Sequence, residues 1–316
     1  MPDVDARPVA ICLMGPTAAG KTALAVDLVR RLPVEIISVD SALVYRGLDI
    51  GTAKPGRDVL DRAPHRLIDI LDPSEAYSAA RFRSDALAAM KEIERAQRVP
   101  LLVGGTMLYY RALELGLSPL PAADKAVRAR LDADAARVGL GTLYRRLEHL
   151  DPVAAFRIHP NDSQRIQRAL EVHELTGRTL SELRARSTRS TLPHRLVKLV
   201  LSPADRSELH GRIEKRFAEM LRAGFVAEVE GLRTRPDLDL ELPSMRAVGY
   251  RQVWKYLDGH YDWEEMRRRG VAASRQLARR QLTWLRSEIG GTWLDPGARE
   301  ITDRALQALR GAGLPV

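Results

Sequence analysis

The sequence predicts an α/β fold in which a P-loop NTPase-like parallel sheet is covered by helices and carries a helical insertion domain. Three observations predict it. The first third of the chain alternates short apolar runs with helical stretches, the first apolar run ends in a glycine-turned loop, and the middle of the chain shows only helical periodicity. The chain of 316 residues is long enough for one large domain and a smaller one.

The first element is a buried strand that leads into a phosphate-binding loop. Val9–Met14 is apolar, and the next eight residues match G-x-x-x-x-G-K-[ST] at every fixed place and open a helix over Lys21–Arg31. The N–H groups of such a loop and the helix N-terminus surround a polyphosphate, Lys21 adds a full positive charge, and the Thr22 hydroxyl can reach a Mg²⁺ ion. The alternative is a chance strand–turn–helix, which at ordinary glycine usage arises in roughly one chain in a hundred of this length. The expected diphosphate or nucleotide ligands are Gly15, Pro16, Thr17, Ala18, Ala19, Gly20, Lys21 and Thr22.

Further short apolar runs continue the sheet. Glu35–Asp40, Leu67–Ile70 and Val99–Gly104 are predicted strands, and Ala79–Gln97 is a predicted helix with apolar residues at helical spacing. The succession of strand, helix and strand is typical of a parallel sheet covered by helices. The segment Leu117-Ser-Pro-Leu-Pro121 breaks this pattern.

The break divides the chain into three parts. We expect the first part of the core over residues 1–117, a helical insertion domain over 118–194, and the second part of the core with basic C-terminal helices over 195–316. Leu196–Leu201 predicts a strand that returns to the sheet, and Ser202-Pro203 opens a helix that ends near Ala223.

The charge of the chain favours a polyanionic partner. Its 50 Lys and Arg residues exceed its 41 Asp and Glu residues, which gives a formal net charge of +9. The excess is concentrated in the insertion and in a C-terminal helix, where Arg268, Arg275, Arg279 and Arg286 follow one helical stripe. For either segment alone, the alternative is an ordinary solvated surface.

Composition also excludes several classes. No run of about 18 apolar residues could span a membrane, so we expect a cytoplasmic protein that uses no membrane. Cys12 is the single cysteine, which excludes a disulfide framework and a cysteine metal site, and we expect it in the core. The seven histidines show no metal-ligand spacing and are expected at the surface or at helix caps.

The candidate catalytic acid lies at a strand end. A kinase or ATPase with this loop is expected to have an apolar strand that ends in an aspartate for Mg²⁺, but Val99–Val103 ends in Gly-Gly-Thr instead. Asp40 follows the second strand, where open α/β sheets place their ligand, and it could bind metal or accept a proton. Asp49 and Asp69 are alternatives by position, and an ordinary turn or helix cap is the alternative role for Asp40.

Five blocks of sequence, in this order, resemble those of the bacterial tRNA dimethylallyltransferases. They are the loop GPTAAGKT, the run from Asp40 to Pro55, Gly104-Gly-Thr-Met-Leu-Tyr109, Arg246-Ala-Val-Gly-Tyr-Arg251 and Gln281-Leu-Thr-Trp-Leu-Arg286. The resemblance spans almost the whole chain. It implies transfer of a dimethylallyl group from dimethylallyl diphosphate to the exocyclic amine of adenosine 37, next to the anticodon, in tRNAs that read codons beginning with U.

The resemblance also implies roles for single residues. Asp40 is the expected base, because a carboxylate that accepts a proton assists the poorly nucleophilic adenine amine. Thr106 is expected to form a hydrogen bond at the reacting centre, and Arg216 to contact the diphosphate together with Mg²⁺ held by Thr22. From the sequence alone, Thr106 could equally be a turn or N-cap residue, and Arg216 a solvated one. Leu43 departs from the family pattern, in which many relatives carry Gln.

The implied substrate tRNA is bound through its anticodon stem-loop, with the target base extruded into a channel. The implied tRNA contacts are Asp40, Ser41, Ala42, Leu43, Thr106, Arg128, Gln164, Arg165, Ile166, Gln167, Arg168, Arg246, Ala247, Val248, Gly249, Tyr250, Arg251, Arg279, Arg280, Gln281, Leu282, Thr283, Trp284, Leu285 and Arg286. We expect the protein to act as a monomer. The rival functions are an NTP-dependent kinase and an RNA-binding P-loop module without chemistry on the base.

Overall fold

The computed structural model describes residues 7–186, 192–288 and 290–314, and it divides into two compact units. The core comprises Met1–Glu114 and Leu192–Val316, and the insertion comprises Leu115–Thr191.

The core is built on a six-stranded sheet in the order β3-β2-β4-β1-β5-β6. All neighbouring strands are parallel, and Met14, Val39 and Gly104 are register partners at the carboxyl ends of β1, β2 and β4. The strands are β1 (Val9–Met14), β2 (Val34–Val39), β3 (His65–Arg66), β4 (Val99–Gly104), β5 (Arg195–Leu201) and β6 (Thr292–Leu294). The loops that follow β1, β2 and β4 therefore begin next to one another at the same edge of the sheet.

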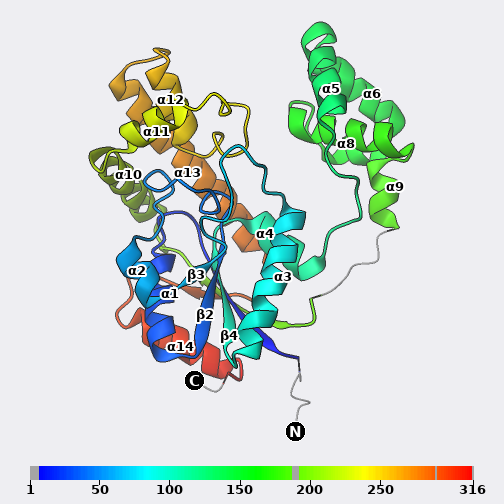
Figure 1. Cartoon of the computed structure of the whole chain (residues 1–316). Coiled ribbons are helices and arrows are strands. Elements are labelled where there is room, and N and C mark those ends of the chain that lie inside the picture. The colour runs from blue at the N-terminus through cyan, green and yellow to red at the C-terminus, as the bar shows by residue number, and fades with distance from the viewer. Residues whose placement is uncertain (1–6, 187–191, 289, 315–316) are drawn as a thin grey trace. The chain divides into compact units, whose positions relative to one another are not determined.

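Alternating residues of the strands bury both faces of the sheet. Ile11 and Leu13 belong to the cluster that contains the apolar residues of α1 (Lys21–Arg31) and α14 (Ile301–Gly311). Cys12 and Met14 belong to the cluster on the other face, with α3 (Ala79–Arg95) and α4 (Met107–Leu115). Figure 1 shows α1 and α14 on one side of the strands and α3 and α4 on the other. Cys12 is fully buried, which confirms it as a core residue.

The second part of the core adds helices at the carboxyl ends of the strands. These are α10 (Arg206–Arg222), α11 (Phe225–Arg233), α12 (Tyr250–Leu257) and α13 (Trp263–Ser287), while α2 (Arg57–Arg62) follows the long loop after β2. Helix α13 packs against α10 at Gly270, where a Cβ atom would lie 2.1 Å from the Phe217 ring. This close approach brings α10 and α13 together above the strand ends.

The insertion has a hydrophobic core of its own. Its helices are α5 (Lys125–Val138), α6 (Leu140–Leu150), α7 (Pro152–Arg157), α8 (Ser163–Thr176) and α9 (Leu180–Ala185), which pack around Leu131, Leu147 and Leu170. The fully buried carboxylate of Glu171 accepts hydrogen bonds from Arg128 and Arg168 and from the backbone N–H of Asp124. Burial acts to raise the pKa of Glu171, but the arginine bonds outweigh it and the pKa is lowered.

Several elements differ from those expected. β1, α1 and β4 have the predicted bounds, but the strand predicted over Leu67–Ile70 is wrong, because Leu67 and Asp69 have left-handed φ angles of 64° and 56°. Only His65 and Arg66 pair with β2 there. The three-residue β6 is not predicted. His194, expected at the surface or at a helix cap, is buried and pairs with Glu94.

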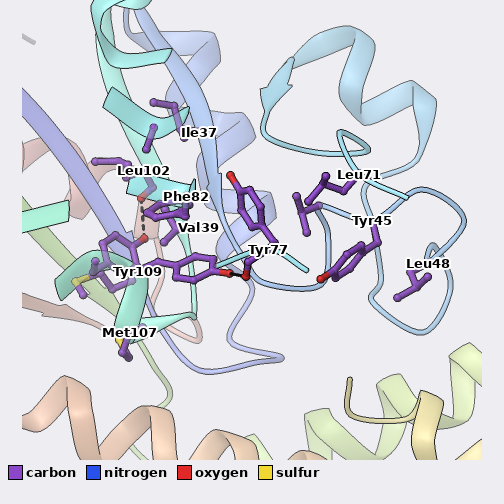
Figure 2. Close-up of a cluster of buried hydrophobic side chains, with 14 of the residues drawn as sticks. Ile37, Val39, Tyr45, Leu48, Leu71, Tyr77, Phe82, Leu102, Met107 and Tyr109 are labelled. Atoms are coloured by element: carbon purple, nitrogen blue, oxygen red, sulfur yellow. Dashed lines mark hydrogen bonds between the residues drawn. The ribbon is translucent and has the colours of Figure 1, made fainter. Parts of the chain in front are cut away.

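The loop after β2 is anchored by Tyr45, which lies beside Leu48 and Leu71 in a buried cluster (Figure 2). Tyr45 is 2% exposed and lies in the same buried cluster as Tyr77 and Tyr109. Tyr109 stacks on Phe82 with ring centroids 4.4 Å apart, and its hydroxyl donates to the Tyr77 carbonyl at 3.1 Å. The segment that carries Asp40 is therefore fixed at its far end by the core.

Candidate active site

A cavity of about 180 Å³ lies at the carboxyl ends of β1, β2 and β4. Its polar side chains include Lys21, Thr22, Asp40 and Arg216. Its apolar side chains include Ile213, Phe217 and Met220 of α10, Leu277 of α13, and Leu43 and Val248 of the loops. One cavity thus joins cationic groups, a carboxylate and an apolar wall.

The P-loop owes its shape to two glycines. A Cβ atom at Gly15 would lie 2.3 Å from the Leu201 carbonyl oxygen, and Gly20, the N-cap of α1, has a left-handed φ of 90°. The first N–H groups of α1 have no partner within the helix, so they remain available to an anion. The loop therefore provides the donors that a polyphosphate needs.

Lys21 lies across this loop. Its Nζ donates hydrogen bonds to the carbonyl oxygens of Gly15 at 2.9 Å and Pro16 at 2.8 Å. Burial lowers the pKa of Lys21 to about 8, Asp40 acts in the opposite direction, and the positive charge of Arg216 lowers it further. The cavity is therefore electropositive and prepared for an anionic ligand.

Asp40 follows the last residue of β2, and its carboxylate is oriented by its own loop. Its Oδ1 accepts hydrogen bonds from the N–H groups of Ala42 at 2.8 Å and Leu43 at 3.4 Å. Its Oδ2 has no hydrogen-bond donor among the described residues, which leaves it available to a ligand.

Thr106 is brought to the same loop from β4. Its hydroxyl oxygen accepts a hydrogen bond from the N–H of Ser41 at 3.2 Å, so its hydroxyl hydrogen is free to donate elsewhere. The approach depends on Gly104, because a Cβ atom there would lie 2.0 Å from the Val39 carbonyl oxygen. Asp40 and Thr106 thus come from neighbouring strand ends and are joined through Ser41.

Arg216 lies on the face of α10 that lines the cavity. One of its terminal nitrogens donates to the Thr52 carbonyl at 3.0 Å. Burial lowers the pKa of Arg216, and Asp40 acts in the opposite direction. The interpretation of Arg216 as a solvated residue is therefore wrong, and its placement with Lys21 agrees with the role implied by the resemblance.

The alternative carboxylates do not line the cavity. Asp49 accepts a hydrogen bond from Lys54 Nζ at 2.5 Å, and Asp69 pairs with the same nitrogen. The Lys54 side chain is only 5% exposed and also donates to the Tyr45 carbonyl at 2.8 Å. Asp49 and Asp69 therefore neutralise a buried lysine, which leaves Asp40 as the candidate base.

Glu228 supports the site and was missed by the sequence analysis. Its carboxylate accepts hydrogen bonds from the N–H groups of Asp49, Ile50 and Gly51 at 3.1, 2.7 and 3.2 Å. It also accepts one from the Tyr250 hydroxyl at 2.5 Å. These bonds fix the segment that ends at Thr52, the acceptor of Arg216. No local pattern distinguishes this glutamate from the others on its helix.

The residues that the resemblance assigns to tRNA fall into three groups. Those with exposed side chains are Ser41, Gln164, Arg165, Arg246, Arg279, Arg280, Thr283 and Arg286. Those that are partly buried include Ala42, Leu43, Arg128, Gln167, Arg168, Ala247, Val248, Arg251, Gln281, Leu282 and Trp284. Those that are buried are Ile166, Gly249, Tyr250 and Leu285. The side chains of Ile166, Tyr250 and Leu285 belong to the cores and offer no surface to RNA.

A second cavity, of about 550 Å³, forms a basic groove between α10, α12 and α13. Its basic side chains are Arg206, His210, Arg251, Lys255, Arg269, Arg275 and Arg279, and no carboxylate lines it. Arg269 of the groove pairs with Glu265. In the predicted arginine stripe, Arg268 pairs with the same Glu265 and Arg275 pairs with Glu214, so the stripe is partly neutralised. Arg206, Arg251, Lys255 and Arg279 have no acidic partner among the described residues.

Two further properties of the described residues concern metal binding and membrane insertion. These residues contain no cluster of three or more His, Cys, Asp or Glu side chains that could hold a metal ion. They also contain no helix long and apolar enough to cross a membrane.

The comparisons with known proteins agree with this geometry. The model of the family described as IPP transferase matches residues 43–288. A tRNA dimethylallyltransferase of Alkalilimnicola ehrlichii is 66% identical over 290 residues, covering 92% of this chain and 91% of that protein. One of Thioalkalivibrio sulfidiphilus is 62% identical over 313 residues, covering 97% and 98%.

Solved structures are similar over nearly the whole chain. A tRNA isopentenylpyrophosphate transferase of Bacillus halodurans has a TM-score of 0.70 and 37% identity, with 97% of this chain and 98% of that chain covered. A eukaryotic dimethylallyltransferase acting on tRNA has a TM-score of 0.77 and 25% identity, with 95% and 78% covered. The resemblance of the five sequence blocks is thus confirmed, and the chain belongs to the IPP transferase family.

Proposed function

We propose that this protein transfers a dimethylallyl group from dimethylallyl diphosphate to the exocyclic amine of adenosine 37 in tRNAs that read codons beginning with U. The observation that carries the proposal is the single cavity in which Lys21 and Arg216 lie with the carboxylate of Asp40 and an apolar wall. The relatives named above as tRNA dimethylallyltransferases support the same reaction.

The two parts of the donor, its diphosphate and its five-carbon chain, fit different parts of the cavity. The diphosphate would bind the N–H groups of the P-loop, Lys21 and Arg216, and the five-carbon chain would lie on apolar side chains such as Phe217 and Leu277. The cationic groups stabilise the negative charge that develops on the leaving diphosphate.

The acceptor amine would react near Asp40. The amine nitrogen forms a bond to C1 of the dimethylallyl group while the C1–O bond breaks, and the diphosphate leaves with the bonding electrons. The nitrogen loses one proton, and the Oδ2 atom of Asp40 can accept it because its Oδ1 atom is already bonded to the loop. The hydroxyl hydrogen of Thr106 can donate a hydrogen bond at the reacting base.

Mg²⁺ fits the residues at the start of α1. In P-loop proteins the Ser or Thr hydroxyl at this position binds Mg²⁺ beside the phosphates, and the ion keeps several water ligands, so Thr22 would hold it together with diphosphate oxygens and water. When bound, Mg²⁺ would neutralise part of the negative charge of the diphosphate.

The tRNA would be held by positive charge in two regions. The basic groove offers Arg206, Arg251, Lys255 and Arg279 to backbone phosphates, and the segment Lys125–Arg195, which spans most of the insertion, carries 14 basic and 8 acidic residues. Because Asp40 lies within a cavity at the strand ends, the target base must leave the anticodon stack to reach it.

A transfer assay tests the proposal. Labelled dimethylallyl diphosphate, Mg²⁺ and unmodified tRNA should give labelled tRNA without ATP, whereas label appearing only from the γ-phosphate of ATP would support a kinase. Asp40→Asn should lower kcat by about 10²–10⁴-fold while tRNA binding persists, because the amide oxygen can keep the bonds to Ala42 and Leu43. Asp61→Asn, at an exposed position on α2, is the control. If the wild-type protein transferred no label, the rival function as an RNA-binding P-loop module without chemistry on the base would remain.

A further inference from the structure

The side chain of Gln281 joins two loops of the cavity. Its Nε2 atom donates a hydrogen bond to the Gly105 carbonyl at 2.8 Å, and its Oε1 atom accepts one from the N–H of Thr17 at 2.9 Å. Gln281 lies on α13, Thr17 lies in the P-loop, and Gly105 lies in the turn between β4 and α4. A single amide therefore connects three separate segments of the core.

The lack of a side chain at Gly105 leaves space for this amide. A Cβ atom at position 105 would lie 2.4 Å from Gln281 Nε2 and 3.1 Å from the Gly15 carbonyl oxygen. Gly105 has no left-handed φ, so its lack of a side chain provides space and not conformational freedom. The turn after β4 thus approaches the P-loop closely enough to receive the amide between them.

The two loops carry opposite halves of the proposed reaction. The P-loop side holds Lys21, which is bonded to the Gly15 and Pro16 carbonyls. The other side continues from Gly105 to Thr106, whose hydroxyl accepts the N–H of Ser41 next to Asp40. The position of the leaving group relative to the base therefore depends on how these loops are held together.

We propose that Gln281 is a positioning residue that sets the distance between the diphosphate cradle and the Asp40–Thr106 pair, and that it is not primarily a tRNA contact. This inference rests on the proposed function. A misplacement of about 1 Å between reacting groups lowers a rate by about 10²-fold, so loss of the two hydrogen bonds should act on the chemical step.

The test compares Gln281→Met with Gln307→Met. Methionine has a similar length but forms neither bond, and Gln307 is exposed on α14, away from the cavity. We expect Gln281→Met to lower kcat by about 10–100-fold, with a tRNA Kd within about twofold of wild type and a similar melting temperature. Gln307→Met should change none of these values. A tRNA Kd weakened by about tenfold with kcat unchanged would overturn the inference.

A second pair of variants keeps the test decisive if Gln281→Met folds poorly. Gly105→Ala should lower kcat strongly in the wild-type background, because the new Cβ atom meets the Gln281 amide. In a Gln281→Ala background the same change should have an effect at least about tenfold smaller. Equal effects in both backgrounds would show that the amide does not set the turn. Wild-type transfer in the same assay reports separately on the proposed function.

Discussion

Lys21 should make the binding of dimethylallyl diphosphate depend on pH. Its pKa in the ligand-free protein is about 8, lowered by burial, so the lysine loses its charge across a range in which the diphosphate is fully ionised. Only the ammonium form attracts the diphosphate. The affinity should therefore be nearly constant between about pH 7 and 7.5 and fall by about tenfold per pH unit well above pH 8.

Calorimetry of dimethylallyl diphosphate binding without tRNA, at constant ionic strength, measures this dependence. Bound diphosphate favours the charged form of Lys21, so kcat at saturating donor should remain constant to a higher pH than kcat/KM. Lys21→Ala should bind more weakly and lose the pH dependence. A Kd that changes by less than about twofold between pH 7.5 and 9.5, or an unchanged dependence in Lys21→Ala, would refute the reasoning.

Three further results are expected. Glu228→Gln should lower the free energy of unfolding by about 2 kcal/mol in urea titrations, because the new amide nitrogen would face backbone N–H donors or the Tyr250 hydroxyl. The exposed Glu230→Gln is the control. Equal losses of unfolding free energy in the two variants would contradict the role of Glu228. The double variant Arg206→Ala/Lys255→Ala should weaken tRNA binding without raising the KM for the donor, and the slope of log K for tRNA binding against log salt concentration should fall by about 1–2. The exposed pair Lys91→Ala/Arg299→Ala should leave this slope unchanged. An unaltered slope in the first double variant would exclude the basic groove from RNA binding. Glu171→Gln should destabilise the insertion by about 2–3 kcal/mol, measured as faster hydrogen exchange in α5 and α8. The exposed Glu148→Gln should leave this exchange unchanged. Unchanged exchange in Glu171→Gln would show that the pairs with Arg128 and Arg168 contribute little to the stability of the insertion.

The parts of the site that are local in sequence could be predicted. The P-loop depends on a strand, two glycines and a helix start that all lie between Val9 and Thr22, and Asp40 follows directly from a strand end. The turn at Leu67–Ile70 was wrongly predicted as a strand, because an apolar run does not reveal that Leu67 and Asp69 adopt left-handed angles. Apolar composition alone does not define a strand.

The supporting residues could not be predicted, because their partners are distant in sequence. Gln281 is separated from Thr17 by 264 positions, and Glu228 from Ile50 by 178. Both lie on helices among other polar residues, and only the packing of α11 and α13 near the strand ends gives them their partners. The family resemblance located the block that contains Gln281, but it implied a tRNA contact and not the bridge between two loops.

The choice between prenyl transfer and phosphoryl transfer depends on what surrounds the P-loop and not on the loop itself. The loop provides donors for any polyphosphate, and β4 ends in glycines where a kinase is expected to carry a metal-binding aspartate. Those glycines let the turn after β4 reach both Val39 and the Gln281 amide, which brings Thr106 to the Asp40 loop. At the same time, α10 and α13 cover the cradle with apolar side chains that suit a hydrocarbon better than a ribose. A carboxylate can accept a proton in either reaction, so Asp40 alone does not decide between them. The apolar wall beside it and the absence of an aspartate at the end of β4 favour transfer of a hydrocarbon group.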